Sequence, residues 1–216
     1  MNFEQKPDYF SMSEVTNFDE AVEYTSSVLC NGGVVLIPTD TVYGLICSPK
    51  CTEAVNNVFN MKQRPASWRL PIIVADQEQA KEQLPFVWNT AASLLASKYW
   101  PGALTIACGI EENNNIEWLA GRDEAAVRVP NYPFIQKLAK KMGPLLMTSA
   151  NRHGDRTPHT VEGALNSLAI RPTLAIDGGL LSGAPSTLVN VNLPKPVIER
   201  EGTIPKTEIE RLLYDA

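Results

Sequence analysis

The chain has 216 residues, of which 44% are hydrophobic and 20% are charged, a composition typical of a globular protein that excludes a disordered one. Its formal net charge of −5 argues against non-specific nucleic-acid binding as the main task, because proteins with that task usually carry a basic excess. Its apolar runs are shorter than the roughly 20 residues that span a bilayer, and residues 1–6 lack the apolar core of a secretory signal. We therefore expect a cytoplasmic protein with no membrane partner.

Apolar periodicity predicts helices and strands in alternation along the chain. The first expected helix covers residues 18–29, and the second begins with Thr52 as its cap. Further helices are expected over residues 89–99, 133–142, 161–168 and 205–213. Strands are expected over residues 34–37, 42–47, 70–75, 103–108, 125–129, 145–149, 173–176, 187–191 and 197–200. This alternation predicts an α/β or mixed α+β fold, and the lack of repeats or long linkers predicts a single domain over residues 1–216.

Short polar segments lie where the expected strands and helices end, which is where ligands bind in open α/β sheets. The segment Thr39-Asp40-Thr41-Val42-Tyr43 follows a buried strand, and it either holds a small ligand or forms an ordinary turn. The segment Lys62-Gln63-Arg64-Pro65 either complements a helix C-terminus or grips a phosphate chain with two cations. Because no glycine-rich phosphate loop is present, a nucleotide would be held mainly by side chains.

The remaining polar positions are less informative one by one. Arg128 interrupts an apolar strand, and a buried arginine needs an anion, either an internal carboxylate or that of a substrate. The segment Thr148-Ser149-Ala150-Asn151 suits a phosphate, ribose or carboxylate, or else a turn or cap. Ser186 leads into a strand, Arg200 ends one, and Thr105 is by itself best interpreted as a β-branched strand residue.

No cluster of residues has the spacing of a metal site or of a catalytic triad. The two histidines, His153 and His159, lie in one polar segment without a nucleophile partner. We therefore expect no metal held by protein side chains, and a chemistry that depends on positioning and charge.

In chain order, the segments PTDTVYGL, KQRP, LPIIV, PGALT, VRVP, TSAN, GAPSTLV and EREG resemble the YrdC-type threonylcarbamoyl-AMP synthase family. They extend from residue 38 to residue 202, and their joint order and spacing are very specific. The resemblance is to the short, single-domain bacterial type. It implies a twisted, open sheet of parallel and antiparallel strands, flanked by helices, with a central basic cavity.

The resemblance also implies a reaction. L-Threonine would combine with bicarbonate or carbon dioxide to give a carbamate, which attacks the α-phosphate of ATP and releases pyrophosphate. Mg²⁺ would accompany the ATP. The product, threonylcarbamoyl-AMP, would pass to a transferase complex that modifies tRNA.

The family roles can be carried to matching positions of this chain. The residues implied to bind threonine are Thr41, Tyr43, Arg128 and Ser149. The residues implied to bind ATP are Lys62, Arg64, Thr105, Asn151, Ser186 and Arg200. Of these, Lys62 and Arg64 are also implied to be catalytic, because cations stabilise a pentavalent phosphate and a leaving pyrophosphate. The sequence departs from the common family pattern at Arg69, His153 and Asn190, where proline, serine and aspartate are usual.

Two other functions stay open from the sequence. One is a paralogue of the same fold with another substrate, although related chains of the YciO type lack the full Lys-x-Arg and Ser-x-Asn pair that this chain has. The other is a non-catalytic RNA-binding or ribosome-assembly factor, against which the net charge of −5 weighs, although weak RNA binding stays open.

Overall fold

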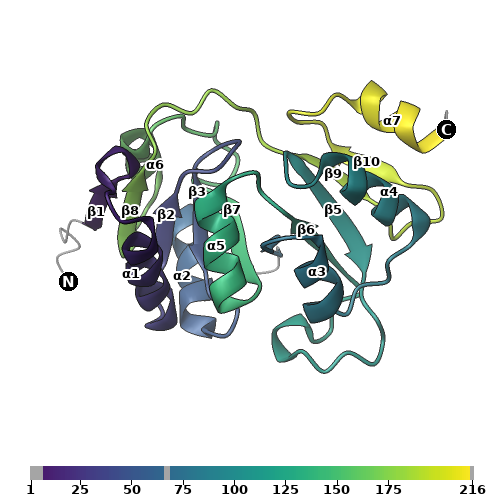
Figure 1. Ribbon diagram of the computed structural model, residues 1–216, viewed down its shortest axis with the longest axis horizontal. Helices are drawn as coiled ribbons and strands as arrows, with labels where there is room; N and C mark the ends of the chain where they lie inside the picture. The colour runs from purple at the N-terminus through teal and green to yellow at the C-terminus, as the bar shows by residue number, and fades with distance from the viewer. Residues whose placement is uncertain (1–6, 66–68, 215–216) are drawn as a thin grey trace. The chain divides into compact units, whose positions relative to one another are not determined.

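The computed structural model describes residues 7–65 and 69–214 of the chain (Figure 1). It falls into two compact units, one made of Met1–Leu70 and Leu145–Gly183 and the other of Pro71–Pro144 and Ala184–Ala216. Each unit combines a mixed sheet with helices, which confirms the expected mixed α/β class. Among the described residues, no helix is long and apolar enough to cross a membrane.

The first unit is built on five strands in the order β1-β8-β2-β3-β7. Strands β1 and β2 run parallel to β8, whereas β3 runs antiparallel to both β2 and β7. Every residue of β2 and β3 is buried, as expected of strands covered on both faces. The strands are β1 (Asp8–Ser11), β2 (Val35–Ile37), β3 (Gly44–Cys47), β7 (Leu145–Ser149) and β8 (Leu174–Asp177).

Three helices of this unit follow from local sequence signals. Asn17 caps α1 (Phe18–Cys30) by accepting hydrogen bonds from Asp19 N and Glu20 N. The helix α2 (Thr52–Lys62) is capped by Cys51, whose Sγ accepts from Ala54 N at 3.5 Å, so the prediction of Thr52 as the cap was wrong. The last of these helices is α6 (Val161–Ser167), and a short 3-10 helix, η1 (Met12–Glu14), precedes α1.

The second unit contains the strands β4-β6-β5-β9-β10 in that order. Strand β4 is parallel to β6 and β9 is parallel to β5, whereas β5 runs antiparallel to β6 and β10 antiparallel to β9. The strands are β4 (Ile72–Ile73), β5 (Leu104–Gly109), β6 (Glu124–Arg128), β9 (Thr187–Asn190) and β10 (Val197–Arg200). The helices are α3 (Gln77–Gln83), α4 (Thr90–Tyr99), α5 (Pro133–Met142), α7 (Lys206–Tyr214) and the 3-10 helix η2 (Glu117–Leu119).

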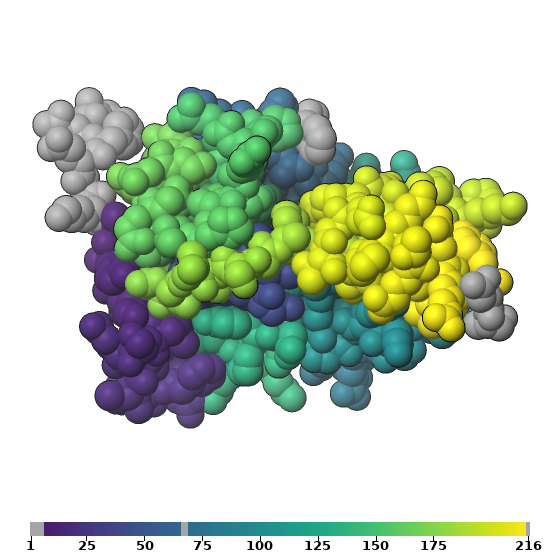
Figure 2. Space-filling model, turned by 90° about the horizontal axis from the view of Figure 1, so that it is seen from above, coloured from purple at the N-terminus to yellow at the C-terminus, as the bar shows by residue number. Residues whose placement is uncertain are grey.

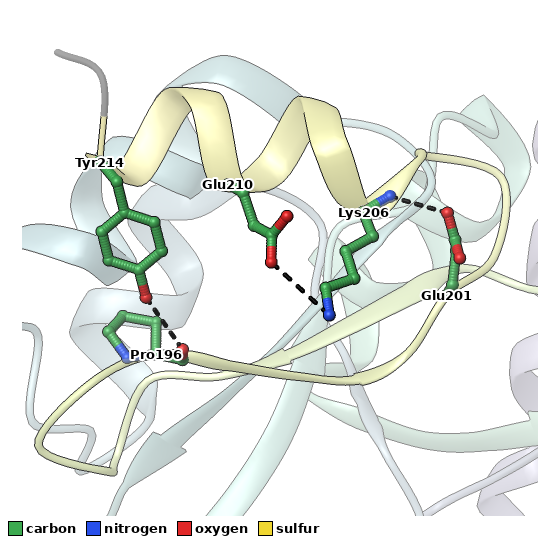
Figure 3. A network of polar contacts seen from close by, with 5 residues as sticks. All are labelled: Pro196, Glu201, Lys206, Glu210 and Tyr214. Atoms are coloured by element: carbon green, nitrogen blue, oxygen red, sulfur yellow. Dashed lines mark hydrogen bonds and ion pairs between the residues drawn. The ribbon is translucent and has the colours of Figure 1, made fainter.

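The C-terminal helix α7 lies on the surface of its unit. Ile209 is its only buried residue, and the C-terminal residues form the exposed yellow area of Figure 2. Four residues tie the helix to the strand β10 and the turn around it, as Figure 3 shows. Lys206 N donates to Glu201 Oε1 at 2.8 Å at the start of the helix, and Tyr214 Oη donates to Pro196 O at 3.1 Å at its end.

Candidate functional site

The turn between β2 and β3 is organised by Thr39. Its Oγ1 accepts hydrogen bonds from the backbone nitrogens of Thr41, at 3.0 Å, and Val42, at 3.1 Å. The Thr41 hydroxyl lies 2.9 Å from the same oxygen, and both threonines are buried. The sequence therefore builds a side-chain-closed turn here, which fixes where the Thr41 hydroxyl lies.

Tyr43 is fully buried, and its hydroxyl lies within a hydrogen-bond network at the end of β8. It donates to Gly179 O at 2.7 Å, accepts from Gly178 N at 3.0 Å and lies 3.2 Å from Asp177 Oδ1. Asp177 also accepts from Tyr9 Oη at 2.8 Å. The Tyr43 hydroxyl thus contacts the backbone that follows β8, a role that the sequence alone did not indicate.

Asp177 is the charged centre of this network. Its burial acts to raise its pKa, but hydrogen bonds from Gly179 N, Tyr9 and Tyr43 together hold the pKa below its ordinary value. The same interaction with Asp177 is the main reason that the pKa of Tyr9 is raised to about 12. The carboxylate is therefore charged at neutral pH and orders the start of the segment after β8.

Lys62 is the last residue of α2 and is only 2% exposed. Its Nζ donates to Ser149 O, to Asn151 O at 2.6 Å and, more weakly, to Asn151 Oδ1 at 3.5 Å. Burial, and then the charge of Arg64, lower the pKa of Lys62 to about 7. Two of the segments singled out in the sequence, KQRP and TSAN, therefore meet at this ammonium group.

Arg64 extends the contact between these two segments. Its Nη1 donates to Thr148 Oγ1 at 3.4 Å, and Thr148 is the residue before Ser149. The chain reverses between Lys62 and Arg64 because Gln63 takes up the left-handed conformation, with φ 49° and ψ 44°. Both cations are thus directed to the end of β7, where they form an arrangement suited to an anionic ligand.

Three of the residues expected to bind ATP lie together in the second unit. Thr105 Oγ1 and Ser186 Oγ are 2.7 Å apart, and both residues are buried. Arg200 donates from Nε, at 3.0 Å, and from Nη2, at 2.8 Å, to Ser186 O, and from Nη2 to Ser186 Oγ at 3.1 Å. The planar guanidinium is therefore held in one orientation by a single serine.

The close approach of the chain at this point requires a glycine. A Cβ atom on Gly202 would lie 2.1 Å from Pro185 O and 2.6 Å from the carbonyl carbon of Ser186. Thr187 Oγ1 accepts from Gly202 N at 3.0 Å, which binds the turn after β10 to the start of β9. The glycine of the EREG segment is thus a packing requirement for the Arg200–Ser186 contact.

Arg128 ends β6 in the second unit and is 6% exposed. Its Nε donates to Gly102 O at 2.9 Å, a backbone carbonyl within the PGALT segment. Two segments of the sequence pattern, VRVP and PGALT, are therefore in contact through this arginine. The described residues contain no group of three or more histidine, cysteine or acidic side chains that could hold a metal ion.

The ten residues proposed from the sequence are divided between the two units. The first unit holds Thr41, Tyr43, Lys62, Arg64, Ser149 and Asn151, and the second holds Thr105, Arg128, Ser186 and Arg200. The sequence did not indicate the supporting roles of other polar residues, among them Asp177 and Asn190. Their partners become neighbours only through sheet register, so no local pattern could have identified them.

Comparison with known proteins places these features in a family. Residues 27–202 match the family model Sua5_yciO_yrdC, which is described as "Telomere recombination". The chain is 32% identical over 203 residues to the threonylcarbamoyl-AMP synthase of Bacillus subtilis, covering 93% of this chain and 58% of that protein. It is 31% identical over 193 residues to a putative threonylcarbamoyl-AMP synthase of Methanocaldococcus jannaschii, covering 89% and 90%.

Solved structures agree with the fold. The chain matches the structure of Pyrococcus abyssi Sua5 complexed with L-threonine with a TM-score of 0.83 at 29% identity, covering 97% of this chain and 61% of that one. It matches Escherichia coli YciO with a TM-score of 0.80 at 24% identity, covering 97% and 99%, which bears on the fold alone. The chain thus spans about 60% of the Bacillus and Pyrococcus relatives and nearly the whole of the other two.

Proposed function

The chain belongs to the Sua5/YciO/YrdC family, and from this premise we propose that it is a threonylcarbamoyl-AMP synthase. The reaction joins L-threonine and bicarbonate or carbon dioxide into a carbamate, which attacks the α-phosphate of ATP. Threonylcarbamoyl-AMP forms and pyrophosphate leaves. Several curated relatives bear this name, and one related structure is a complex with L-threonine.

The observation that carries the proposal is the pair of cations at the end of α2, of which Lys62 is buried and Arg64 half-buried. Lys62 is 2% exposed, and the charge of Arg64 is one cause of its lowered pKa, so the two like charges oppose each other in the protein. Burying a charge costs free energy that an anionic partner recovers. A polyphosphate beside Lys62 and Arg64 would offset the cost of burying the charge and reduce the repulsion between the two cations, which supports ATP as the ligand.

The residues of the first unit are assigned to phosphate and threonine. Lys62 supplies a point charge and Arg64 a planar fork, and both stabilise charge that develops on the α-phosphate and on the leaving pyrophosphate. Ser149 and Thr41 offer hydroxyls to threonine, and Asn151 lines the nucleotide site. Tyr43 contributes to the threonine site by ordering the backbone after Asp177.

The residues of the second unit are assigned to the nucleotide and to the threonine carboxylate. Arg128 pairs with the carboxylate, because its fork geometry matches two carboxylate oxygens. Thr105, Ser186 and Arg200 form a polar surface for ATP, which Arg200 complements in charge. Catalysis by this set is electrostatic and orientational.

The proposed ATP is the complex with Mg²⁺. This ion prefers phosphate and water oxygens to a dedicated cage of protein ligands, and it would neutralise phosphate charge. The product would pass to a transferase complex acting on tRNA, which places the protein in the cytoplasm.

The direct test is to identify the product. Purified protein is incubated with ATP, Mg²⁺, L-threonine and ¹³C-bicarbonate, and the mixture is analysed by mass spectrometry. We expect threonylcarbamoyl-AMP one mass unit heavier than from ordinary bicarbonate. Arg64→Ala and Arg128→Ala should abolish it, whereas Arg69→Ala, at an exposed arginine, should not. Full activity in both of the first two variants, or no labelled product despite ATP binding, would refute the proposal.

A further inference from the structure

The strand β10 contains a β-bulge directly before Arg200. Along β10, Ile198 pairs with Val189 and Arg200 pairs with Leu188, so Glu199 is an extra residue without a partner on β9. A bulge of this kind increases the local twist of a strand and changes the direction of the side chains beside it. The direction in which Arg200 leaves β10 therefore depends on how the bulge at Glu199 is held.

A buried asparagine holds this bulge. Asn190 ends β9 and is 3% exposed. Its Nδ2 donates to Glu199 Oε1 at 2.8 Å and to Glu124 Oε2 at 3.1 Å, and its Oδ1 accepts from Asn192 N at 2.9 Å. Because ionised carboxylates only accept hydrogen bonds, both glutamates must face the amide nitrogen. Both N–H donors of this side chain are thus used, and its oxygen accepts one hydrogen bond.

We propose that Asn190 is a positioning residue that holds the bulge at Glu199 and so aims the guanidinium of Arg200 at Ser186. The inference deepens the proposed function and rests on it where it treats Arg200 as an ATP contact. On the far side of Arg200, Glu201 is held by Lys206 N at 2.8 Å (Figure 3). The two glutamates that flank Arg200 are therefore both fixed, one by Asn190 and the other by the start of α7.

In this chain, where Glu124 and Glu199 both face position 190, only a side chain that donates can make these two contacts. An aspartate at position 190 would have nearly the shape of asparagine but would put a third carboxylate against Glu124 and Glu199. Neighbouring carboxylates do not all stay ionised, so one would take up a proton or move away. Glu199 is exposed on the edge strand, so its side chain is the one that can turn away into solvent. The bulge would then lose the hydrogen bond between positions 190 and 199.

The first arm of the test measures MgATP and threonine affinity by calorimetry. Asn190→Asp should weaken MgATP binding about tenfold, the scale of one hydrogen bond to a charged group, and leave threonine binding unchanged. In an Arg200→Ala background the same substitution should cause no further loss, because the two residues act through one contact. Asn115→Asp, the same change at an exposed residue in the segment after β5, should bind MgATP as the wild type does.

A rescue separates positioning from general damage. The double variant Asn190→Asp/Glu199→Gln reverses the donor and the acceptor, so the new amide can donate to the new carboxylate. MgATP affinity should return in part, because the new carboxylate at position 190 still faces that of Glu124. Glu199→Gln alone keeps an acceptor for Asn190 and should bind MgATP normally. Failure of the double variant to recover, or an additive loss in the Arg200→Ala background, would overturn the proposal.

The last arm does not depend on ATP. Amide hydrogen exchange should quicken along β9 and β10 in Asn190→Asp and slow again, toward the wild-type rate, in the double variant. If the wild-type protein binds no ATP, the proposed function fails, but this arm still decides whether Asn190 holds the bulge. Native exchange rates in Asn190→Asp would show that it does not.

Discussion

Lys62 Nζ lies 2.6 Å from the backbone oxygen of Asn151, and this bond ties the end of α2 to the turn that follows β7. A second bond runs the other way, from His153 N to Lys62 O at 2.9 Å. The lysine thus holds the turn by its side chain and by its main chain. A ligand that attracts the ammonium will also act on this turn.

The lowered pKa of Lys62 predicts a pH dependence of stability. The pKa of Lys62 is about 7 in the folded protein and 10.5 in the unfolded chain. Between these two pH values the unfolded chain therefore binds a proton that the folded protein does not. The free energy of unfolding should therefore rise with pH from about 7 to about 10 through this group. Urea unfolding of the wild type and of Lys62→Met across this range measures the effect.

In Lys62→Met, the free energy of unfolding should lack this contribution to its rise with pH, whereas Lys50→Met, at an exposed lysine, should keep it. Identical pH dependence in the wild type and Lys62→Met would show that Lys62 is charged in the folded protein at all these pH values. In the same range MgATP binding should take up a proton, since phosphate favours the charged ammonium.

Tyr43→Phe should destabilise the protein more than Tyr9→Phe. Both hydroxyls contact Asp177. Tyr43 is fully buried, and its hydroxyl also accepts from Gly178 N and donates to Gly179 O, whereas Tyr9 is 53% exposed. Loss of the buried hydroxyl leaves partners unsatisfied and should cost about 1–3 kcal/mol. Loss of the exposed one should cost within about 0.5 kcal/mol. Chemical denaturation measures both, and equal costs would contradict the account.

Gly202→Ala should weaken both folding and ATP binding. The new Cβ would meet Pro185 O at 2.1 Å, and backbone atoms must move apart to admit it, at a cost of about 2 kcal/mol or more. Gly121→Ala is a useful comparison, because that site has φ +68° but nothing within 4 Å. It should cost about 1–2 kcal/mol from backbone strain alone and leave ATP affinity unchanged. Wild-type ATP affinity in Gly202→Ala would separate this turn from the nucleotide site.

Much of the fold could be predicted from periodicity and from end signals. The helix α5 (Pro133–Met142) was expected over the same residues, and its ends have clear local signals: Pro133 lies in its first turn, and Gly143, with φ +84°, follows its last residue. The strand β5 was expected over residues 103–108, a mainly apolar segment, and all of its residues are buried. Such elements are specified by residues close in the chain.

Other elements have no local signal. The helix α3 (Gln77–Gln83) is polar and buries only Gln79 and Ala80, so it presents no apolar stripe. The strand β1 exists through pairing with β8, far along the chain. The apolar run 70–75 forms only a two-residue strand, β4, because pairing with β6 is limited to Ile72 and Ile73. The cap of α2 is a thiol, which is outside the usual set of capping residues.

The motifs of the candidate site could be found in the sequence, but the residues that hydrogen-bond to them could not. The sequence indicated that Lys62 and Asn151 belong to one polar site, and the structure places them in hydrogen-bond contact. It indicated Tyr43 as a threonine contact, whereas the Tyr43 hydroxyl contacts Asp177 and the backbone after it. Partners that depend on sheet register, such as Asn190 with Glu199, cannot be identified from local spacing.

The central claim is that this chain makes an adenylate from ATP with a carbamate of threonine as the nucleophile. Its most direct test is pyrophosphate release from ATP by the purified protein, with threonine and bicarbonate each supplied or withheld. The account predicts release only when both are present, and little release when valine, which lacks the hydroxyl, replaces threonine. Release that needs no bicarbonate, or none with any amino acid although ATP binds, would contradict it.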